Sequence, residues 1–161
     1  LNNQPTLEKT QEHLDDALKK GAKILLGGKT EDVRATSLYF PATVIDGVTR
    51  DMLLNTDETF GPVAPVITFK TDQEAIEIAN ESRYGLQMSV FTSSIKKTFF
   101  YADRLRTGNL VVNDTTDYWE AHEPFGVSGR KKSGYVRLGI RYTLEDVTSF
   151  KTVAIDIQKT Q

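Results

Sequence analysis

The chain has 161 residues, with 20 basic against 22 acidic side chains and a hydrophobic fraction of 39%. This length fits one ordinary domain or a piece of a larger one. The nearly balanced charge gives no electrostatic reason to expect nucleic acid or a membrane surface as a partner, and no segment approaches the roughly 20 apolar residues of a membrane span.

The chain contains no cysteine and two histidines. The missing cysteine excludes disulfides, thiolate metal sites and a cysteine nucleophile within these residues, and it agrees with the cytoplasmic location that we expect. The histidines, His13 and His122, lie far apart in the sequence, so no metal site is expected. Because the first residue is Leu1 rather than Met, we expect the chain to be the inside of a longer one.

The first half of the sequence predicts one helix and several short strands. Residues 6–21 place acidic side chains early and basic ones late, with Thr6 as the expected N-cap and Gly21 as the stop. Strands are then expected, in chain order, at 22–26, 39–45 and 64–69, with a short apolar piece at 52–54.

The second half alternates helices with strands at the spacing of βαβ units. Helices are expected at 72–80, with Thr71 as cap, and at 95–105; strands are expected at 89–92 and 109–113, a turn or helix end at 142–145, and a last strand at 148–157. The pattern predicts the α/β class with a mostly parallel sheet and flanking helices.

Residues 114–133 form a long stretch without periodicity. Such a stretch inside a compact domain is usually functional or disordered, and its aromatic content argues against simple disorder. We expect its basic side chains, Arg130, Lys131 and Lys132, to form a solvated turn, and His122 to be an exposed loop residue.

The sequence DETFGPV at 57–63 allows two interpretations. Glu58 is either an acid that caps a local turn or a ligand-binding carboxylate, and Phe60 is either a core residue or the wall of a ligand site. Gly61-Pro62 forms a turn under both interpretations, because proline fixes the backbone there.

Four landmarks follow one another along the chain: DETFGPV at 57–63, Tyr84-Gly85-Leu86, Thr107-Gly108-Asn109, and PFG at 124–126 followed by Ser133-Gly134. Their order and spacing resemble the C-terminal part of the catalytic domain of the aldehyde dehydrogenase superfamily. The resemblance covers nearly the whole chain, since the residues before DETFGPV also resemble the corresponding part of that family.

The resemblance implies an enzyme that oxidises an aldehyde to an acid with NAD or NADP. In that family a cysteine thiolate attacks the aldehyde, hydride passes to the nicotinamide, and water activated by a glutamate releases the acyl group. Glu58 matches the glutamate that binds the nicotinamide ribose, Phe60 the ring beside the nicotinamide, and Phe125 a residue lining the substrate tunnel. A carboxylate suits a ribose diol and an aromatic ring suits a flat heterocycle.

The chain departs from the family pattern in two ways. No residue here can be the nucleophile, so this chain alone is expected to be inactive, and no catalytic residue is assigned to it. The loop after PFG carries Val127 where the family has a second glycine.

The resemblance divides the chain into a catalytic-domain portion at 1–147 and a terminal strand at 148–161. That strand would make subunit contacts in a homo-oligomer, because its exposed edge needs a partner.

Two further hypotheses stay open. One is a non-catalytic binding or assembly module that kept this half of the fold, and the other is an unrelated α/β ligand-binding domain. The aldehyde and the choice between NAD and NADP are not determined by these residues.

Overall fold

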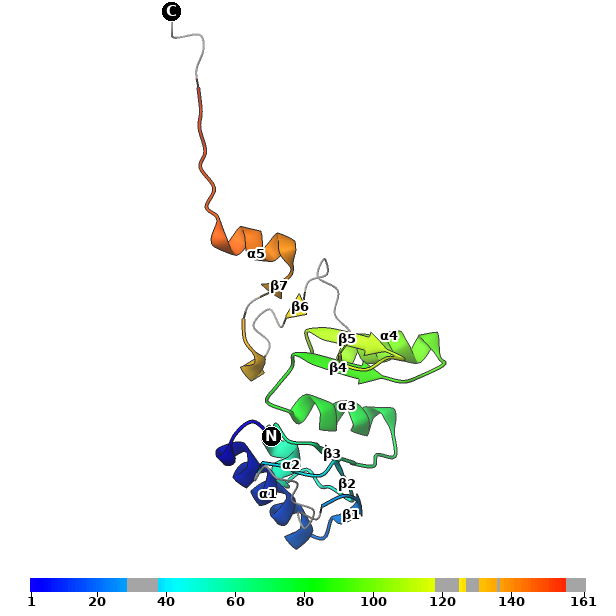
Figure 1. Ribbon diagram of the computed structural model, residues 1–161. Helices are drawn as coiled ribbons and strands as arrows, with labels where there is room; N and C mark the ends of the chain where they lie inside the picture. The colour runs from blue at the N-terminus through cyan, green and yellow to red at the C-terminus, as the bar shows by residue number, and fades with distance from the viewer. Residues whose placement is uncertain (29–37, 118–124, 127–130, 136, 156–161) are drawn as a thin grey trace, which may run out of the picture. The chain divides into compact units, whose positions relative to one another are not determined.

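The computed structural model describes residues 1–28, 38–117, 125–126, 131–135 and 137–155 (Figure 1). Its elements are α1 (Gln4–Lys19), β1 (Lys23–Leu26), β2 (Thr43–Asp46), α2 (Leu53–Thr56), β3 (Val63–Pro65), α3 (Asp72–Glu81), β4 (Gln87–Val90), α4 (Ile95–Arg104), β5 (Asn109–Val112), β6 (Phe125–Gly126), a 3-10 turn (Lys131–Ser133), β7 (Arg137–Leu138) and α5 (Ile140–Val147). They form two compact units, Leu1–Arg83 and Tyr84–Gln161, each described by itself.

The first unit is a three-stranded sheet packed against α1. β2 is the central strand, antiparallel to β1 and parallel to β3. The core combines Leu14 and Ala17 of α1 with Ile45 of β2 and residues that follow it, namely Val48, Met52 and Leu54. Leu14 and Ile45 are fully buried, so the packing of α1 on β2 forms the centre of this unit.

The first helix begins earlier than the sequence predicted. Asn3, not Thr6, is the N-cap, and its side-chain oxygen accepts a hydrogen bond from the Thr6 amide at 2.9 Å. Pro5 lies in the first turn, where its missing N–H costs nothing. The stop is as predicted, because Gly21 follows the helix with a φ of 99°, a conformation that glycine adopts freely.

The strands of this unit are shorter than predicted. β2 begins only at Thr43, because Pro41 lacks the N–H that a ladder needs. β3 covers three residues. The apolar piece at 52–54 is the start of a helix, α2, whose first amide is bonded by Asp16 of α1: Leu53 N donates to Asp16 Oδ2 at 2.8 Å.

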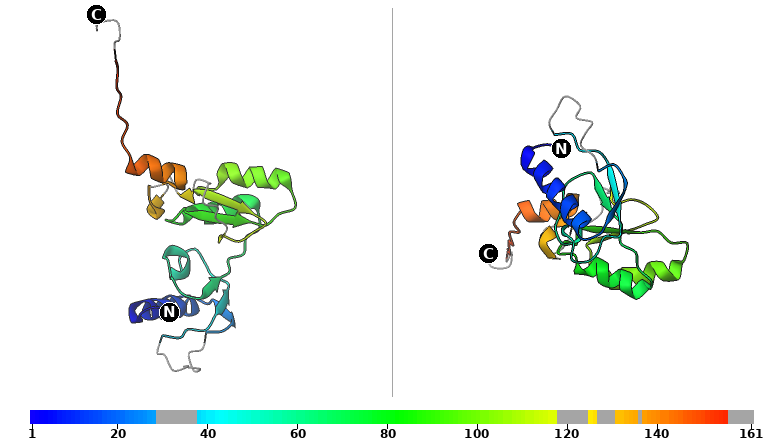
Figure 2. Two further views of the ribbon diagram at one scale, coloured as in Figure 1. Left: turned by 45° about the horizontal axis from the view of Figure 1, so that its top comes forward. Right: turned by 90° about the horizontal axis from the view of Figure 1, so that it is seen from below.

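The second unit contains a parallel pair, β4 and β5, and a short antiparallel pair, β6 and β7. α4 runs alongside β4 and β5 in every view (Figure 2). Ser94 caps α4 and Thr71 caps α3 in the first unit, the latter as predicted. Parallel pairs occur in both units, and the α/β class predicted from the sequence is confirmed.

The C-terminal region differs from the prediction. Residues 140–147 form a full helix, α5, where a turn or helix end was expected. The described part of the predicted last strand, 148–155, makes no β-ladder. A strand exists only when another strand pairs with it, so this prediction is wrong for the chain by itself. None of the described helices is both long enough and apolar enough to cross a bilayer.

The core position of Leu14 leads to a stability prediction. Leu14→Ala is expected to lower the free energy of unfolding by about 2–5 kcal/mol, because it leaves a cavity in a fully packed core. Leu18→Ala is the control on the same helix, since Leu18 is 39% exposed, and it is expected to cost about 0.5 kcal/mol. Denaturant unfolding of the two variants checks this, and equal losses would contradict the position of the core.

Candidate functional site

The segment 57–63 joins α2 to β3, and its side chains alternate between inward and outward directions. Glu58 and Phe60 are exposed, whereas Thr59 and Gly61, which flank Phe60, are partly buried. The Phe60 ring is 76% exposed. This exposure contradicts the interpretation of Phe60 as a core residue of the described chain, while the ligand-site interpretation stays a prediction.

The backbone of Phe60 adopts an unfavourable conformation. Its φ is 55°, in the left-handed region that a bulky side chain rarely enters. A residue is held there only when its surroundings impose it, and such residues gather at functional sites. The strain therefore agrees with a functional role of the segment.

Helix α1 holds this segment at two places. His13 Nδ1 and Thr59 Oγ1 are hydrogen bonded at 3.0 Å, and both His13 and Thr10 are buried. Gly61 lies so close to Thr10 that a Cβ at position 61 would be 2.4 Å from Thr10 Oγ1. The two contacts hold the residues on either side of Phe60.

Three further contacts fix the ends of the segment. Arg83 pairs with Asp57 and also donates from Nη2 to the Thr56 carbonyl at 2.8 Å. At the other end, Thr43 N of β2 donates to the Pro62 carbonyl at 2.8 Å. In contrast, the interactions of the described residues include no hydrogen bond or ion pair that holds the Glu58 carboxylate, so nothing supports its role as a local cap.

In the second unit, three of the sequence landmarks meet at Gly85. The Gly85 amide donates to Ser133 Oγ at 3.0 Å, and the Gly85 carbonyl accepts from the Gly108 amide at 2.8 Å. The next amide, Asn109 N, donates to the Leu86 carbonyl at 3.1 Å. The glycine-rich motifs thus join the 3-10 turn to the start of the parallel pair.

Two other residues of this unit bear on the sequence predictions. Asn113 follows β5 with a φ of 60°, and its side chain bonds both the amide and the carbonyl of Thr92.

Lys131 is only partly exposed, and burial is the main cause that lowers its pKa, followed by nearby Arg106. The expectation of a solvated basic turn stays a prediction, since Lys132 is exposed and Lys131 partly exposed, while Arg130 and His122 lie outside the described residues.

Phe125, the predicted substrate-tunnel residue, lies in β6, where its backbone pairs with Leu138 of β7. Its side chain is outside the described part of the chain. Glu58 and Phe60 belong to the first unit and Phe125 to the second. The structure adds that both predicted cofactor residues are exposed on their shared segment, and it describes Phe125 within the second unit by itself.

Sequence reasoning missed the residues that hold the segment, namely Thr10, His13 and Arg83. Their signal was weak: Thr10 and His13 are polar residues within the turns of α1 that also carry its buried apolar side chains, Leu14 and Ala17. Polar residues on a buried face need partners, and that requirement was the available clue.

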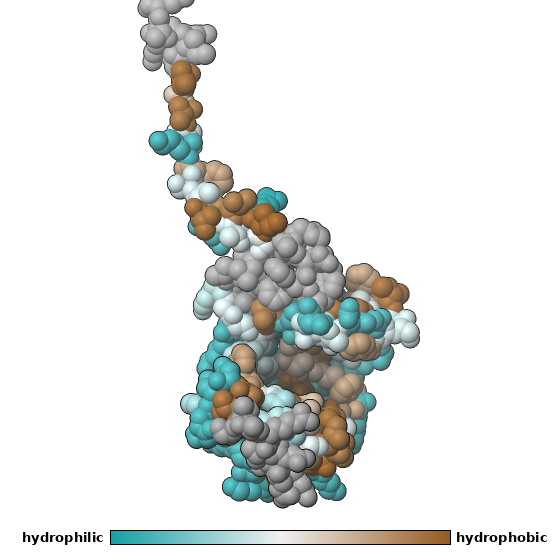
Figure 3. Space-filling view, viewed as in Figure 1, coloured by the Kyte–Doolittle hydropathy of each residue, from teal (hydrophilic) through white to brown (hydrophobic). Residues whose placement is uncertain are grey.

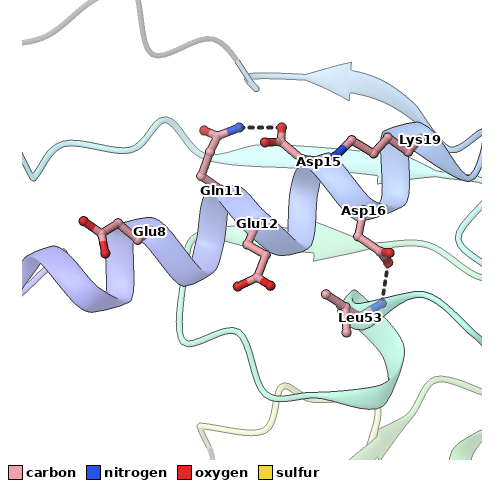
Figure 4. Close-up of a pocket in the computed structure, with 7 residues that line it drawn as sticks. All are labelled: Glu8, Gln11, Glu12, Asp15, Asp16, Lys19 and Leu53. Carbon is pink, nitrogen blue, oxygen red and sulfur yellow. Dashed lines mark hydrogen bonds between the residues drawn. The ribbon is translucent and has the colours of Figure 1, made fainter.

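A separate hollow runs along α1 and holds none of the predicted site residues (Figure 4). Its lining is mainly acidic: Glu8, Gln11, Glu12, Asp15, Asp16, Lys19 and Leu53. The bond from the Leu53 amide is the main cause that lowers the pKa of Asp16, followed by the bond from Lys20. Asp16 therefore serves to connect α1 with α2.

Comparison with known proteins identifies the family. The model of the aldehyde dehydrogenase family matches residues 1–153. The chain therefore belongs to the aldehyde dehydrogenase family.

Individual relatives agree with this assignment. A lactaldehyde dehydrogenase from Methanococcus maripaludis is 42% identical over 142 residues, which are 88% of this chain and 29% of the relative. A mitochondrial succinate-semialdehyde dehydrogenase from Oryza sativa is 38% identical over 155 residues, which are 96% of this chain and 28% of the relative. The chain thus spans less than a third of the length of these relatives.

Solved structures give the same result. An NAD-dependent aldehyde dehydrogenase from Sinorhizobium meliloti superposes with a TM-score of 0.82 at 35% identity, covering 92% of this chain and 29% of that one. The glyceraldehyde-3-phosphate dehydrogenase GapN from Methanocaldococcus jannaschii, in complex with NADP, gives a TM-score of 0.80 at 37% identity, covering 92% and 31%. These similarities confirm the predicted family and fold.

The lowered pKa of His13 predicts that the free energy of unfolding depends on pH. Burial and then Lys9 lower its pKa below the ordinary value of 6.5, while Glu12 and Asp16 act in the opposite direction. The unfolded chain therefore binds a proton before the folded chain does. The free energy of unfolding is expected to fall as the pH drops below about 6.5, by at most about 1.4 kcal/mol per pH unit, until the folded pKa is passed.

Denaturant unfolding between pH 7.5 and pH 5 measures this effect. The variant His13→Gln is the control and is expected to show a flatter dependence in the same range. Identical slopes for the two proteins would show that His13 is not the group responsible.

Proposed function

We propose that this chain supplies the nicotinamide-ribose site of an NAD(P)-dependent aldehyde dehydrogenase that oxidises an aldehyde to a carboxylic acid. The reaction runs through a cysteine thioester, and the nucleophile is not among these 161 residues, which include no cysteine. The observation that carries the proposal is the segment 57–63, which in a member of this family presents Glu58 and Phe60 outward from a tightly held backbone.

The two exposed side chains suit the cofactor. Glu58 can accept hydrogen bonds from the two hydroxyls of a ribose, and no described contact occupies its carboxylate. The Phe60 ring, 76% exposed, offers a flat apolar surface to the nicotinamide. The cofactor, when bound, supplies the hydride acceptor, while these residues bind and orient it.

The choice between NAD and NADP is left open by this site. The relatives include an NAD-dependent enzyme and one crystallised with NADP. Glu58 and Phe60 would contact the nicotinamide half, which is the same in both cofactors. We therefore propose the nicotinamide nucleotide as the cofactor class and an aldehyde as the substrate class.

Phe125 is proposed to line the substrate tunnel. Its backbone is held in the β6–β7 pair, and the 3-10 turn that follows it in the chain is held through Ser133 at Gly85. These contacts, one at residue 125 and one at Ser133, would help to keep the position of residue 125 constant, as a substrate-lining position requires.

The experiment uses the natural polypeptide that carries these 161 residues, assayed for aldehyde-dependent reduction of NAD+ and NADP+. Glu58→Gln is expected to raise the KM for the nucleotide roughly tenfold, because one charged acceptor is lost. Glu8→Gln, on the exposed side of α1, is the charge-matched control and is expected to leave KM unchanged. The isolated 161-residue chain is expected to be inactive.

The outcome also decides between the enzyme and the non-catalytic module. Reduction of the nucleotide that is abolished by thiol alkylation supports the enzyme. A natural polypeptide that neither reduces NAD+ or NADP+ nor binds them would overturn the proposal and favour a non-catalytic binding or assembly module.

Self-association is the second part of the proposal. Apolar side chains of α5 and the segment after it are widely exposed: Ile140, Leu144, Val147, Phe150, Val153 and Ile155. They give a largely apolar surface along this part of the chain (Figure 3). Such a surface is unusual on a monomer and typical of a protein interface, so we propose that residues 140–155 contact a second subunit.

Sedimentation equilibrium tests the self-association. The chain is expected to gain mass with concentration, and Leu144→Glu is expected to shift it to the monomer, because a charge would then be buried at the interface. Leu25→Glu is the control, since Leu25 is 65% exposed on β1 of the other unit. A strict monomer at high concentration, or equal effects of both variants, would count against this interface.

A further inference from the structure

We infer that Thr10 and His13 of α1 are positioning residues for the segment 57–63. Their contacts with Gly61 and Thr59, called the clamp below, hold Phe60 and Glu58 in their outward orientation. The inference deepens the proposed function and rests on it for the link to the cofactor. The clamp itself is a property of the first unit alone. Neither Thr10 nor His13 belongs to the motif by which the segment was recognised.

The clamp follows from the spacing of its two residues. Thr10 and His13 are three positions apart on a helix, so their side chains lie on the same face. They meet Gly61 and Thr59, the two neighbours of Phe60, both of which are partly buried. Phe60, between them, is directed to the opposite side, where it is exposed.

The first contact is a hydrogen bond and depends on side-chain chemistry. His13 is only 4% exposed, and its Nδ1 is 3.0 Å from Thr59 Oγ1. A buried polar ring without a partner is unfavourable, so His13 and Thr59 hold each other in place. A hydrophobic residue at either position would remove this link without filling a cavity.

The second contact is steric and explains the glycine of the motif. A Cβ at position 61 would be 2.4 Å from Thr10 Oγ1 and 2.6 Å from Thr10 Cγ2, distances that real atoms do not adopt. Gly61 is not among the glycines with a positive φ, so the glycine is required for close approach and not for its own backbone angle. Thr10 is fully buried and donates to the Thr6 carbonyl at 2.7 Å, which keeps it from turning away.

Both contacts bear on the strained residue between them. The φ of 55° at Phe60 is unfavourable for a phenylalanine and persists only under constraint from its neighbours. Contacts that fix residues 59 and 61 provide that constraint. Loss of either contact is therefore expected to let Phe60 relax to a negative φ, which would turn its ring and move Glu58.

A matched pair of variants tests the hydrogen bond. Thr59→Val removes the hydroxyl and keeps the branched shape, whereas Thr59→Ser keeps the hydroxyl. The readout is the intraresidue HN–Hα NOE of Phe60 in the 161-residue chain, which is strong only when φ is positive. Thr59→Val is expected to weaken this NOE, and Thr59→Ser is expected to preserve it.

A double-mutant cycle tests the steric contact. Gly61→Ala is expected to weaken the Phe60 NOE strongly, and Thr10→Ala, which opens the contact without a clash, is expected to weaken it less. In the double variant the two clashing atoms are gone, so the Phe60 NOE is expected to recover in part. Such recovery is non-additive and identifies a direct contact between positions 10 and 61.

The same variants in the natural polypeptide connect the clamp to the cofactor. Thr59→Val is expected to raise the KM for the nucleotide roughly three- to tenfold, which corresponds to one lost hydrogen bond, with a smaller change in kcat. Thr59→Ser is expected to restore the original KM.

The two readouts separate the possible failures. A Phe60 NOE that stays strong in both Thr59→Val and Gly61→Ala would overturn the clamp. A weakened NOE with an unchanged KM would support the clamp and count against the proposed cofactor role of the segment.

Discussion

The contact between α1 and the segment 57–63 is the constraint on which the rest of the first unit depends. One face of α1 carries Leu14 and Ala17 into the core beneath the sheet, while neighbouring turns of the same helix hold Thr59 and Gly61. Core packing and site geometry therefore share one rigid element. Because a short helix does not bend over a few turns, its anchoring in the core also fixes the segment that it contacts.

This arrangement explains how exposed side chains can be precisely placed on a connecting segment. Loops usually carry function because a rigid scaffold positions them. Here the scaffold acts through α1, through Arg83, which binds Asp57 and the Thr56 carbonyl, and through β2, whose Thr43 amide bonds Pro62. Asp57, Thr59 and Gly61 are held, and the residues between them, Glu58 and Phe60, are exposed.

In the second unit, hydrogen bonds to the backbone of a single residue join the sequence landmarks. The glycine-containing landmarks meet at the backbone of Gly85, with Ser133 and Gly108 on its two sides. These bonds join the 3-10 turn and the residue before β5 to the segment that leads into β4. The order of these motifs was visible in the sequence, whereas their convergence on one residue, Gly85, could be seen only in three dimensions.

The sequence by itself determined the family, the α/β class and the helices near 72–80 and 95–105, and it suggested two candidate cofactor residues, because these depend on local pattern and on motif order. Tertiary structure decided the rest. Pairing between distant segments set the ends of β2 and β3, Asp16 placed the start of α2, and residues 148–155 formed no strand because a strand needs a partner that local sequence does not specify. The exposure and the strained backbone of Phe60 likewise come from contacts with α1, nearly fifty positions earlier in the chain, which no local pattern encodes.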